Sequence, residues 1–211
     1  MLEILPLILG PVATNAYLIA DPDTCEAAVI DPAWDGRWIA AKARQRNWQI
    51  GQIWITHSHF DHIGGVGDLA RELEPAPLVA LHPDDRPLWN DQGSAGLFGF
   101  SLPASPAPTL NLVDDQELRL GSRIFKVLHT PGHTPGHCVF YCADAGVCLC
   151  GDLIFRNSVG RTDLPGGDWE TLVNSIRSQI FSLPDETRLL SGHGPETTVG
   201  EEKRGNPFVH A

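Results

Sequence analysis

A short stretch in the first third of the chain is rich in side chains that bind metal ions. The sequence THSHFDHIGG, residues 56–65, places three histidines and an aspartate within six residues. Imidazole nitrogens and carboxylate oxygens are common ligands of zinc and related metals. In an extended segment alternate residues point the same way, which groups His57, His59 and Asp61 and turns His62 elsewhere. This division suits two neighbouring metals better than one.

The other interpretation of this stretch is a polar loop of solvated histidines, and three later motifs argue against it. The motifs HTPGHTPGH, CGDLIF and SGHGPE each lie at the end of an apolar, strand-like run. In the first, His133 is favoured as a ligand because Gly132 allows the turn to push it inward. In the second, Asp152 suits a carboxylate that bridges two metals. In the third, His193 would complete the ligands of the second metal.

The remaining histidines receive more modest roles. His137 begins a strand and is expected to support a ligand by a hydrogen bond. His129, the first residue of HTPGHTPGH, is expected to be structural. His82 and His210 have no partners nearby in sequence, so we expect structural or solvated side chains. The two glycines that close the first stretch predict a place where the backbone must pass close to another segment.

Short strands and a few helices must position these residues. Apolar runs bounded by Gly, Pro, Asn and Asp predict strands, among them QIGQIWIT, RIFKVLHT, HCVFYC and VCLCG. Helical spacing predicts helices from about Asp35, over GGVGDLARELE, and over GGDWETLVNSIRSQIF with Asp168 as N-cap. Two β-rich blocks that each end in helices, with no repeat and no linker, predict one domain over residues 1–211. Its expected layering is two sheets face to face with helices outside.

Bulk composition excludes several classes of protein. The net charge of −11 argues against a nucleic-acid groove, which needs a basic footprint. Five cysteines, an odd number, do not suit a disulfide framework. The apolar N-terminus has no basic start and is interrupted by Pro6 and Pro11, unlike a signal peptide or a membrane span. We therefore expect a cytoplasmic protein.

Residues 91–111, rich in Pro and small side chains, predict either a surface loop or an apolar lid beside a site.

The chain resembles the metallo-β-lactamase superfamily over nearly its whole length. The motifs that carry the resemblance are, in this order, THSHFDH, TPGHT, GD and GHG. Within this superfamily the chain is most similar to glyoxalase II-like hydrolases, in the segments HTPGHTPGH, GRTDLPGGD and GHGPETTVGEEKRGNPFV. The resemblance implies an α+β fold, the αβ/βα four-layer sandwich of two mixed sheets. It also implies two divalent metals, zinc or else iron or manganese. Two triplets and a bridging carboxylate would hold them: His57, His59 and His133; Asp61, His62 and His193; and Asp152.

The resemblance implies hydrolysis of a thioester such as S-lactoylglutathione by a hydroxide that bridges two metals. Bound zinc lowers the pKa of water from 15.7 to about 7, and Asp61 would orient the resulting nucleophile. A thiol, with a pKa near 8.5, leaves without a general acid, and no obvious extra acid stands out in the motifs. The expected partner is a small, glutathione-derived thioester, with neither nucleic acid nor membrane.

One departure concerns how glutathione would be held. Full-length glyoxalase II has a helical C-terminal domain that helps to bind glutathione, whereas this chain resembles the short, single-domain type. Arg161, Lys203 and Arg204 are the candidates for binding a substrate carboxylate. Each is otherwise an ordinary surface cation.

Other activities of the same fold stay open. A persulfide dioxygenase, which the chain resembles at GRTD, would hold a single iron through His57, His133 and Asp152. A hydrolase of another ester or of a lactone is a further alternative. A β-lactamase is less favoured, because Asp152 stands where many such enzymes have cysteine. A non-enzymatic metal protein would need no open coordination position.

Overall fold

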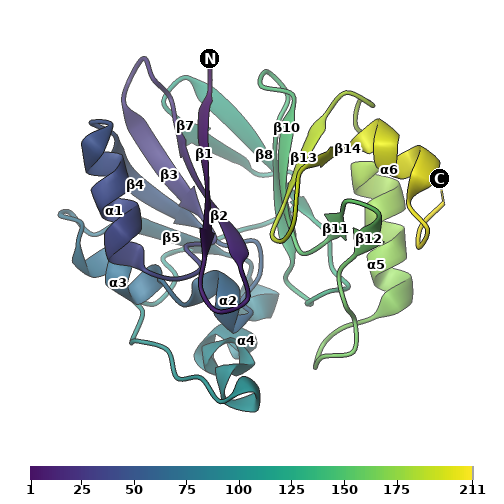
Figure 1. Ribbon diagram of the computed structural model, residues 1–211, viewed down its shortest axis with the longest axis horizontal. Helices are drawn as coiled ribbons and strands as arrows, with labels where there is room; N and C mark the ends of the chain where they lie inside the picture. Colours follow the sequence, from purple (N-terminus) through teal and green to yellow (C-terminus); the bar gives the residue numbers. More distant parts are fainter. Residues whose placement is uncertain (211) are drawn as a thin grey trace.

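Two six-stranded sheets stack face to face in the computed structural model, which describes residues 1–210 (Figure 1). In the first sheet β1, β2 and β3 are antiparallel, and β3 to β6 run parallel. Its strands, in spatial order, are β1 (Glu3–Leu9), β2 (Thr14–Ala20), β3 (Glu26–Ile30), β4 (Gln49–Trp54), β5 (Leu78–Leu81) and β6 (Leu110–Asn111).

The second sheet is also mixed, because β10 and β13 are parallel while the other pairs are antiparallel. Its strands, in spatial order, are β14 (Thr197–Thr198), β13 (Arg188–Ser191), β10 (Val147–Gly151), β9 (Cys138–Cys142), β8 (Arg123–His129) and β7 (Glu117–Leu120). A small hairpin of β11 (Ile154–Phe155) and β12 (Ser158–Val159) stands apart.

Helices cover the outer faces of both sheets and so complete the predicted four-layer αβ/βα sandwich (Figure 1). The first sheet is covered by α1 (Gly36–Gln45) and α3 (Val66–Arg71), and the second by α5 (Trp169–Ser175), its π-helical continuation η3 (Ile176–Ile180), and α6 (Val199–Gly205). At one end of the sandwich lie α2 (Phe60–Ile63), the 3-10 turns η1 (Pro83–Asp85) and η2 (Gln92–Phe98), and α4 (Arg86–Asn90).

The core between the sheets is built around one tryptophan. Trp54, the last residue of β4, is fully buried and packs against two aromatic rings of the opposite sheet. Its ring centroid lies 5.0 Å from that of Phe125 and 5.4 Å from that of Phe140. Alternating apolar residues of β4 and β8 therefore hold the two sheets at a defined separation.

The strand pairing brings all the predicted motifs to one edge. Strands β8, β10 and β13 run in the same direction, and each is followed at its carboxyl end by one of the later motifs. The His-rich stretch follows β4 in the first sheet, and α2, which it forms, lies below the lower end of β2 and above α4 in Figure 1. The site is therefore assembled from loops on a rigid double-sheet scaffold.

Several local expectations are confirmed and others need correction. The Asp168 carboxylate caps α5 by accepting a hydrogen bond from the Thr171 amide at 2.8 Å, as the sequence predicts. The helix expected over GGVGDLARELE is shorter, at Val66–Arg71. The hairpin β11–β12 and strand β14 were not predicted, because two-residue strands show no periodicity that could be recognised.

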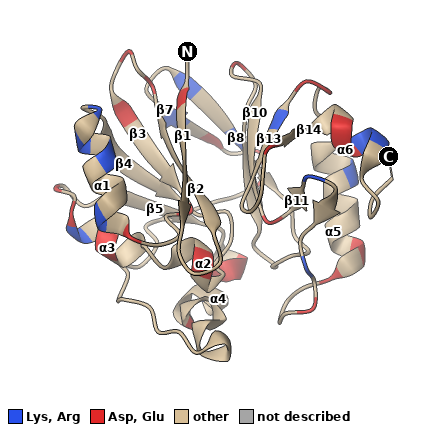
Figure 2. Ribbon diagram, viewed as in Figure 1, with Lys and Arg blue, Asp and Glu red and all other residues tan. Residues whose placement is uncertain are grey.

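Charged residues are spread over the outer helices and the strand ends (Figure 2). None of the helices within residues 1–210 has the length and apolar character that crossing a bilayer requires.

Candidate metal centre

The His-rich stretch changes conformation in its middle, and this change divides its ligands. His59 is still extended, with φ −66° and ψ 149°, but α2 begins at Phe60. Alternation therefore holds for His57 and His59 only. The prediction that Asp61 points with them and away from His62 is wrong, because the helical turn carries Asp61 and His62 together toward His193.

The first ligand group consists of His57, His59 and His133, all buried. The Nε2 atom of His133 lies 2.9 Å from Nδ1 of His59 and 3.2 Å from Nε2 of His57. Three imidazole nitrogens from the two sheets thus converge on one small volume.

The hydrogen bonds behind the His57 and His133 rings leave the converging nitrogens of these two rings unprotonated. The Thr56 hydroxyl donates to Asp31 at 2.6 Å, so it accepts from Nδ1 of His57 at 3.0 Å. Nδ1 of His133 donates to the carbonyl of Arg161 at 2.7 Å. In a neutral imidazole, one protonated nitrogen leaves a lone pair on the other. The Nε2 atoms of His57 and His133 therefore present lone pairs to each other, an arrangement that a cation would stabilise.

The second ligand group consists of Asp61, His62 and His193. Oδ2 of Asp61 lies 3.2 Å from Nε2 of His193 and 3.5 Å from Nε2 of His62. On the far side of the ring, Nδ1 of His62 donates to Asp31 at 2.9 Å. Asp31 thereby directs the Nε2 lone pair of His62 toward the acidic side chains.

Asp152, at the end of β10, lies between the two groups. Its Oδ1 is 3.3 Å from Nε2 of His62, and its Oδ2 is 3.5 Å from Nε2 of His193 and 3.8 Å from Nε2 of His133. Oδ1 of Asp152 and Nε2 of His62 are buried without a hydrogen-bond partner. These two buried polar atoms face each other without a hydrogen bond, and a metal ion that takes the place of a proton on Nε2 of His62 would satisfy both.

Charge and burial shift the pKa values of the histidine ligands in opposite directions in the two groups. Burial and the neighbouring imidazoles hold the pKa of His57 well below its usual value and that of His59 at about 3, so both are neutral ligands at pH 7. Burial also lowers the pKa of His62, but the carboxylates of Asp152 and Asp61 outweigh it and raise that pKa well above normal. Burial raises the pKa of Asp61, but His62 and His193 bring it down to about 2. The second group thus attracts a cation strongly.

Glycines allow the close approaches that the site requires, as the sequence predicts for the end of the His-rich stretch. A Cβ atom on Gly65 would collide with the carbonyl of Pro32, and one on Gly64 would lie 2.7 Å from the Trp34 ring. Gly192, beside His193, faces the Asp152 carboxylate with no room for a side chain.

Two buried aspartates of the site were not identified from the sequence. Asp31 holds both Thr56 and His62, and Asp85 accepts hydrogen bonds from loops that carry ligands. Each follows an apolar strand in a turn (VIDP and LHPDD), where aspartate is common for other reasons. The unusual φ of +48° at Asp31 is the structural sign that its position matters.

His137, His82 and His129 do not join either ligand group. His137 bonds Thr130 at 2.9 Å and stacks on His57, with centroids 5.2 Å apart, so it supports that ligand by packing and not by a hydrogen bond. His82 and His129 stack at 4.1 Å with an interplanar angle of 9°. Ligand atoms of His82, His129 and Asp84 lie within 4.8 Å of one another, but the lone pairs of the two stacked rings lie in nearly parallel planes, which disfavours a further metal site.

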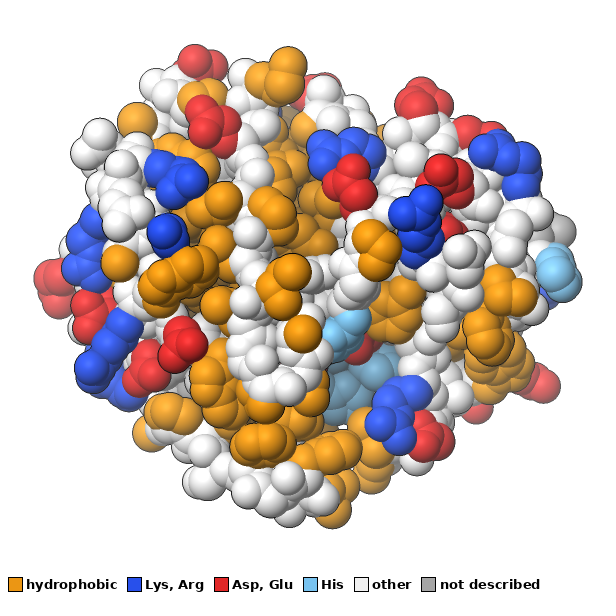
Figure 3. All heavy atoms as spheres, viewed as in Figure 1, with side chains coloured by type: hydrophobic (Ala, Val, Ile, Leu, Met, Phe, Trp, Pro, Cys, Tyr) orange, Lys and Arg blue, Asp and Glu red, His pale blue; other side chains and the backbone are white. Residues whose placement is uncertain are grey.

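Above the ligands is a pocket of about 190 Å³. Figure 3 shows histidine side chains at the base of a hollow bordered by hydrophobic side chains. Its apolar wall comprises Val12, Phe60, Phe98 and Leu164. The rings of Phe98 and Phe60 stack with centroids 5.1 Å apart, so the segment 91–111 borders the site.

The three predicted substrate-binding cations have different positions. Arg161 lines the pocket, where its guanidinium forms two 2.7 Å hydrogen bonds with Asp163. Lys203 and Arg204 do not line it. They approach Asp185 to 2.8 Å and 3.8 Å, on helix α6 at the far right of Figure 2, away from α2.

The fold and this double ligand cluster define a metal-dependent class, and the chain belongs to the metallo-β-lactamase superfamily, whose family model matches residues 9–193. Two relatives show the similarity over nearly full length. The probable metallo-hydrolase YqgX of Bacillus subtilis is 40% identical, covering 96% of this chain and 95% of its own. The hydroxyacylglutathione hydrolase GloC of Haemophilus influenzae is 34% identical, covering 93% of each.

Two solved structures have the same fold at similar identity. The crystal structure of the BLEG-1 B3 metallo-β-lactamase matches with a TM-score of 0.91 and 36% identity over 100% of both chains. That of TTHA1623 in a di-iron-bound form matches with a TM-score of 0.88 and 41% identity, over 97% of this chain and 100% of the other. Divalent metals are therefore the cofactors that the family implies.

Removal of metal is expected to destabilise the protein. A ligand present at 100 times its Kd stabilises the folded state by about 2.7 kcal/mol. For a chain of this size, that corresponds to a fall of about 5–10 °C in Tm on chelation. Differential scanning calorimetry before and after EDTA treatment, and again after zinc is added back, measures this. Equal Tm values in all three samples would contradict metal binding by the folded centre.

Proposed function

We propose that this protein is a hydrolase of small thioesters such as S-lactoylglutathione. The observation that carries the proposal is the joining of both ligand groups through Asp152 at the base of one small pocket. Such an arrangement would place two cations beside a single reacting carbonyl.

The pocket favours a short acyl group. A volume of about 190 Å³ is below the roughly 300–1,000 Å³ typical of sites that enclose a drug-sized ligand. A lactoyl group would fit next to the ligands, while a larger thiol portion would extend across the rim. Arg161 is the cation closest to this rim, but its charge is compensated by Asp163, so a substrate carboxylate would have to displace that partner.

Metals bound by the two groups would supply a water of lowered pKa and polarise the carbonyl. The protein itself contributes an ionised acceptor. Asp61 remains a carboxylate at neutral pH, and its Oδ2 is held by the Thr14 hydroxyl at 2.8 Å. It is therefore positioned to accept a hydrogen bond from an attacking water and orient it. The leaving thiolate, with a pKa near 8.5, needs no proton donor.

The test is an assay of purified protein loaded with zinc or with iron. We expect release of free thiol from S-lactoylglutathione, followed with a thiol reagent. The similarity to BLEG-1 makes nitrocefin the appropriate β-lactam comparison, and a simple lactone covers the other esters. The thioester proposal fails if S-lactoylglutathione stays intact while one of these compounds is cleaved readily.

Oxygen chemistry at iron is the second candidate. His57, His133 and Asp152 provide two histidines and a carboxylate, the set typical of non-haem iron oxygenases. The di-iron form of TTHA1623 supports iron as a metal that such a centre accepts. Oxygen uptake with glutathione persulfide, together with metal analysis of the protein as isolated, distinguishes a dioxygenase from a hydrolase.

A further inference from the structure

A single buried carboxylate joins the two loops that form the first ligand group. Asp85 is fully buried at the end of η1. Its Oδ2 accepts from the Ser58 amide at 2.7 Å and from the Thr134 hydroxyl at 3.0 Å, and its Oδ1 accepts from the Gly136 amide at 2.7 Å.

The donors to Asp85 are neighbours of the metal ligands. Ser58 lies between His57 and His59, and Thr134 follows His133 directly. These two loops belong to different sheets, and one backbone hydrogen bond joins them, from the Cys138 amide to the Thr56 carbonyl at 2.8 Å. The carboxylate of Asp85 fixes both loops at once, and Gly136 leaves room for this contact because a Cβ atom there would lie 2.8 Å from Oδ1.

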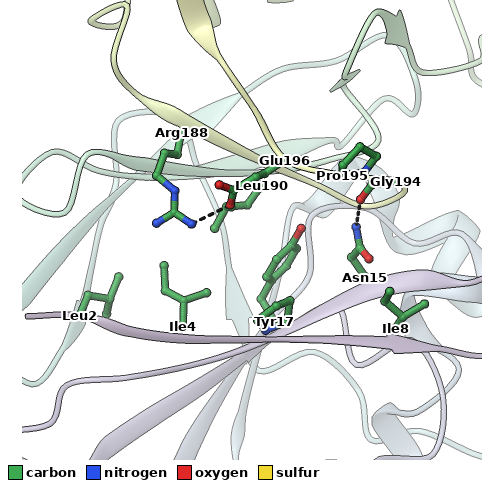
Figure 4. A pocket seen from close by; sticks show the side chains of 11 residues that line it. Leu2, Ile4, Ile8, Asn15, Tyr17, Arg188, Leu190, Gly194, Pro195 and Glu196 are labelled. Atoms are coloured by element: carbon green, nitrogen blue, oxygen red, sulfur yellow. Dashed lines mark hydrogen bonds and ion pairs between the residues drawn. The ribbon is translucent and has the colours of Figure 1, made fainter.

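The loop that carries His193 of the second ligand group is held by a different residue, Asn15 on β2. We call Asp85 and Asn15 the two braces. The Asn15 side-chain amide donates to the carbonyls of Ser191 at 2.9 Å and Gly194 at 2.8 Å, the latter drawn as a dashed line in Figure 4. The Asn15 backbone amide donates to the carbonyl of Gly192 at 2.7 Å. Asn15 thus holds the loop that carries His193 on both sides of that residue.

The two braces are separate in the part of the chain that the structure describes. Asp85 makes no hydrogen bond to residues 191–194, and Asn15 makes none to the loops around His57 and His133. Partners that orient metal ligands typically change metal affinity by about 10–100-fold when they are removed. A separate brace for each group allows the affinities of the two metals to differ.

We propose that Asp85 and Asn15 are positioning residues that set metal affinity independently, Asp85 for the first ligand group and Asn15 for the second. The proposal concerns metal binding and does not depend on which substrate is cleaved. Failure of the thioester assay would therefore leave it standing.

Zinc titration of the metal-free full chain by calorimetry, against a competing chelator, tests this proposal. His59→Ala and His193→Ala identify which binding step belongs to which group. We expect Asp85→Asn to weaken the first-group step by about 10–100-fold and the other step by less than about threefold. Asn15→Leu keeps the volume but loses the amide donors. It should weaken the second-group step by about 10–100-fold and the first-group step by less than about threefold.

Two further variants separate positioning from charge and from general destabilisation. Thr134→Val keeps the Asp85 charge and removes one hydrogen bond, so it should weaken the same step as Asp85→Asn by a smaller factor. Asp21→Asn makes the same loss of charge at a carboxylate that accepts from Ser122 at 2.7 Å, at the opposite end of β2, and should leave both steps unchanged. Equal weakening of both steps by Asp85→Asn, no weakening at all, or the same loss with Asp21→Asn would overturn the proposal.

Discussion

Asp152→Ala is expected to lower kcat by about 10³-fold or more and to reduce the metal content of the purified protein. The Asp152 carboxylate lies within 3.8 Å of imidazole nitrogens in both ligand groups. Without it, the positive charge of two cations would have only Asp61 as an anionic ligand. Loss of about 4 kcal/mol of transition-state stabilisation corresponds to roughly 10³ in rate.

Metal analysis by mass spectrometry and steady-state kinetics check this expectation together. Asp152→Asn serves as the isosteric comparison, because it keeps the shape and one oxygen but lacks the charge. Asp21→Asn is the matched control, because Asp21 follows the end of β2 that is remote from the ligands. It should retain full metal content and turnover. Undiminished metal with full turnover in Asp152→Ala would refute the assignment of Asp152 as the residue that joins the two groups.

The layered fold could be predicted from sequence because the relevant patterns are local. Apolar runs such as those ending at Trp54 and Leu128 have strand lengths, and Asp168 sits where a helix N-cap is needed. The candidate ligands could be found for a related reason. Few residue types bind metals, so their accumulation at successive strand ends is visible without knowledge of the structure.

The supporting residues could not be found in the same way, because their partners are distant in sequence. Asn15 bonds a carbonyl 176 residues away, and Asp85 bonds a hydroxyl 49 residues away. In the sequence each looks like an ordinary turn or strand residue. The orientation of Asp61 was mispredicted because alternation applies only while the chain stays extended, and the helix begins one residue earlier, at Phe60.

The cations illustrate a further limit of sequence interpretation. Motif position suggested Lys203 and Arg204 as well as Arg161, but of these three only Arg161 lines the pocket. Helix α6 covers the second sheet and directs its basic side chains toward Asp185, so a charge near a motif in sequence is not necessarily near the site.

Trp54→Ala is expected to lower the free energy of unfolding by about 3–5 kcal/mol, the usual effect of removing a large aromatic side chain from a core. Trp54 is fully buried between the sheets, against Phe125 and Phe140, and its indole Nε1 donates to Gln52 at 2.9 Å. Urea denaturation of the metal-free protein measures the change. Trp169→Ala, at a tryptophan 45% exposed, should cost less than about 1 kcal/mol.

Trp54→Ala should also weaken metal binding, although Trp54 touches no ligand. His57 and His59 follow the first sheet, whereas His133, Asp152 and His193 follow the second, so the separation of the sheets decides whether the ligands converge. Trp54→Phe, which preserves an aromatic contact, should retain most of the stability and of the zinc affinity. If Trp54→Ala lost stability while zinc affinity in the folded state stayed at the wild-type value, the spacing of the sheets would not control the metal centre.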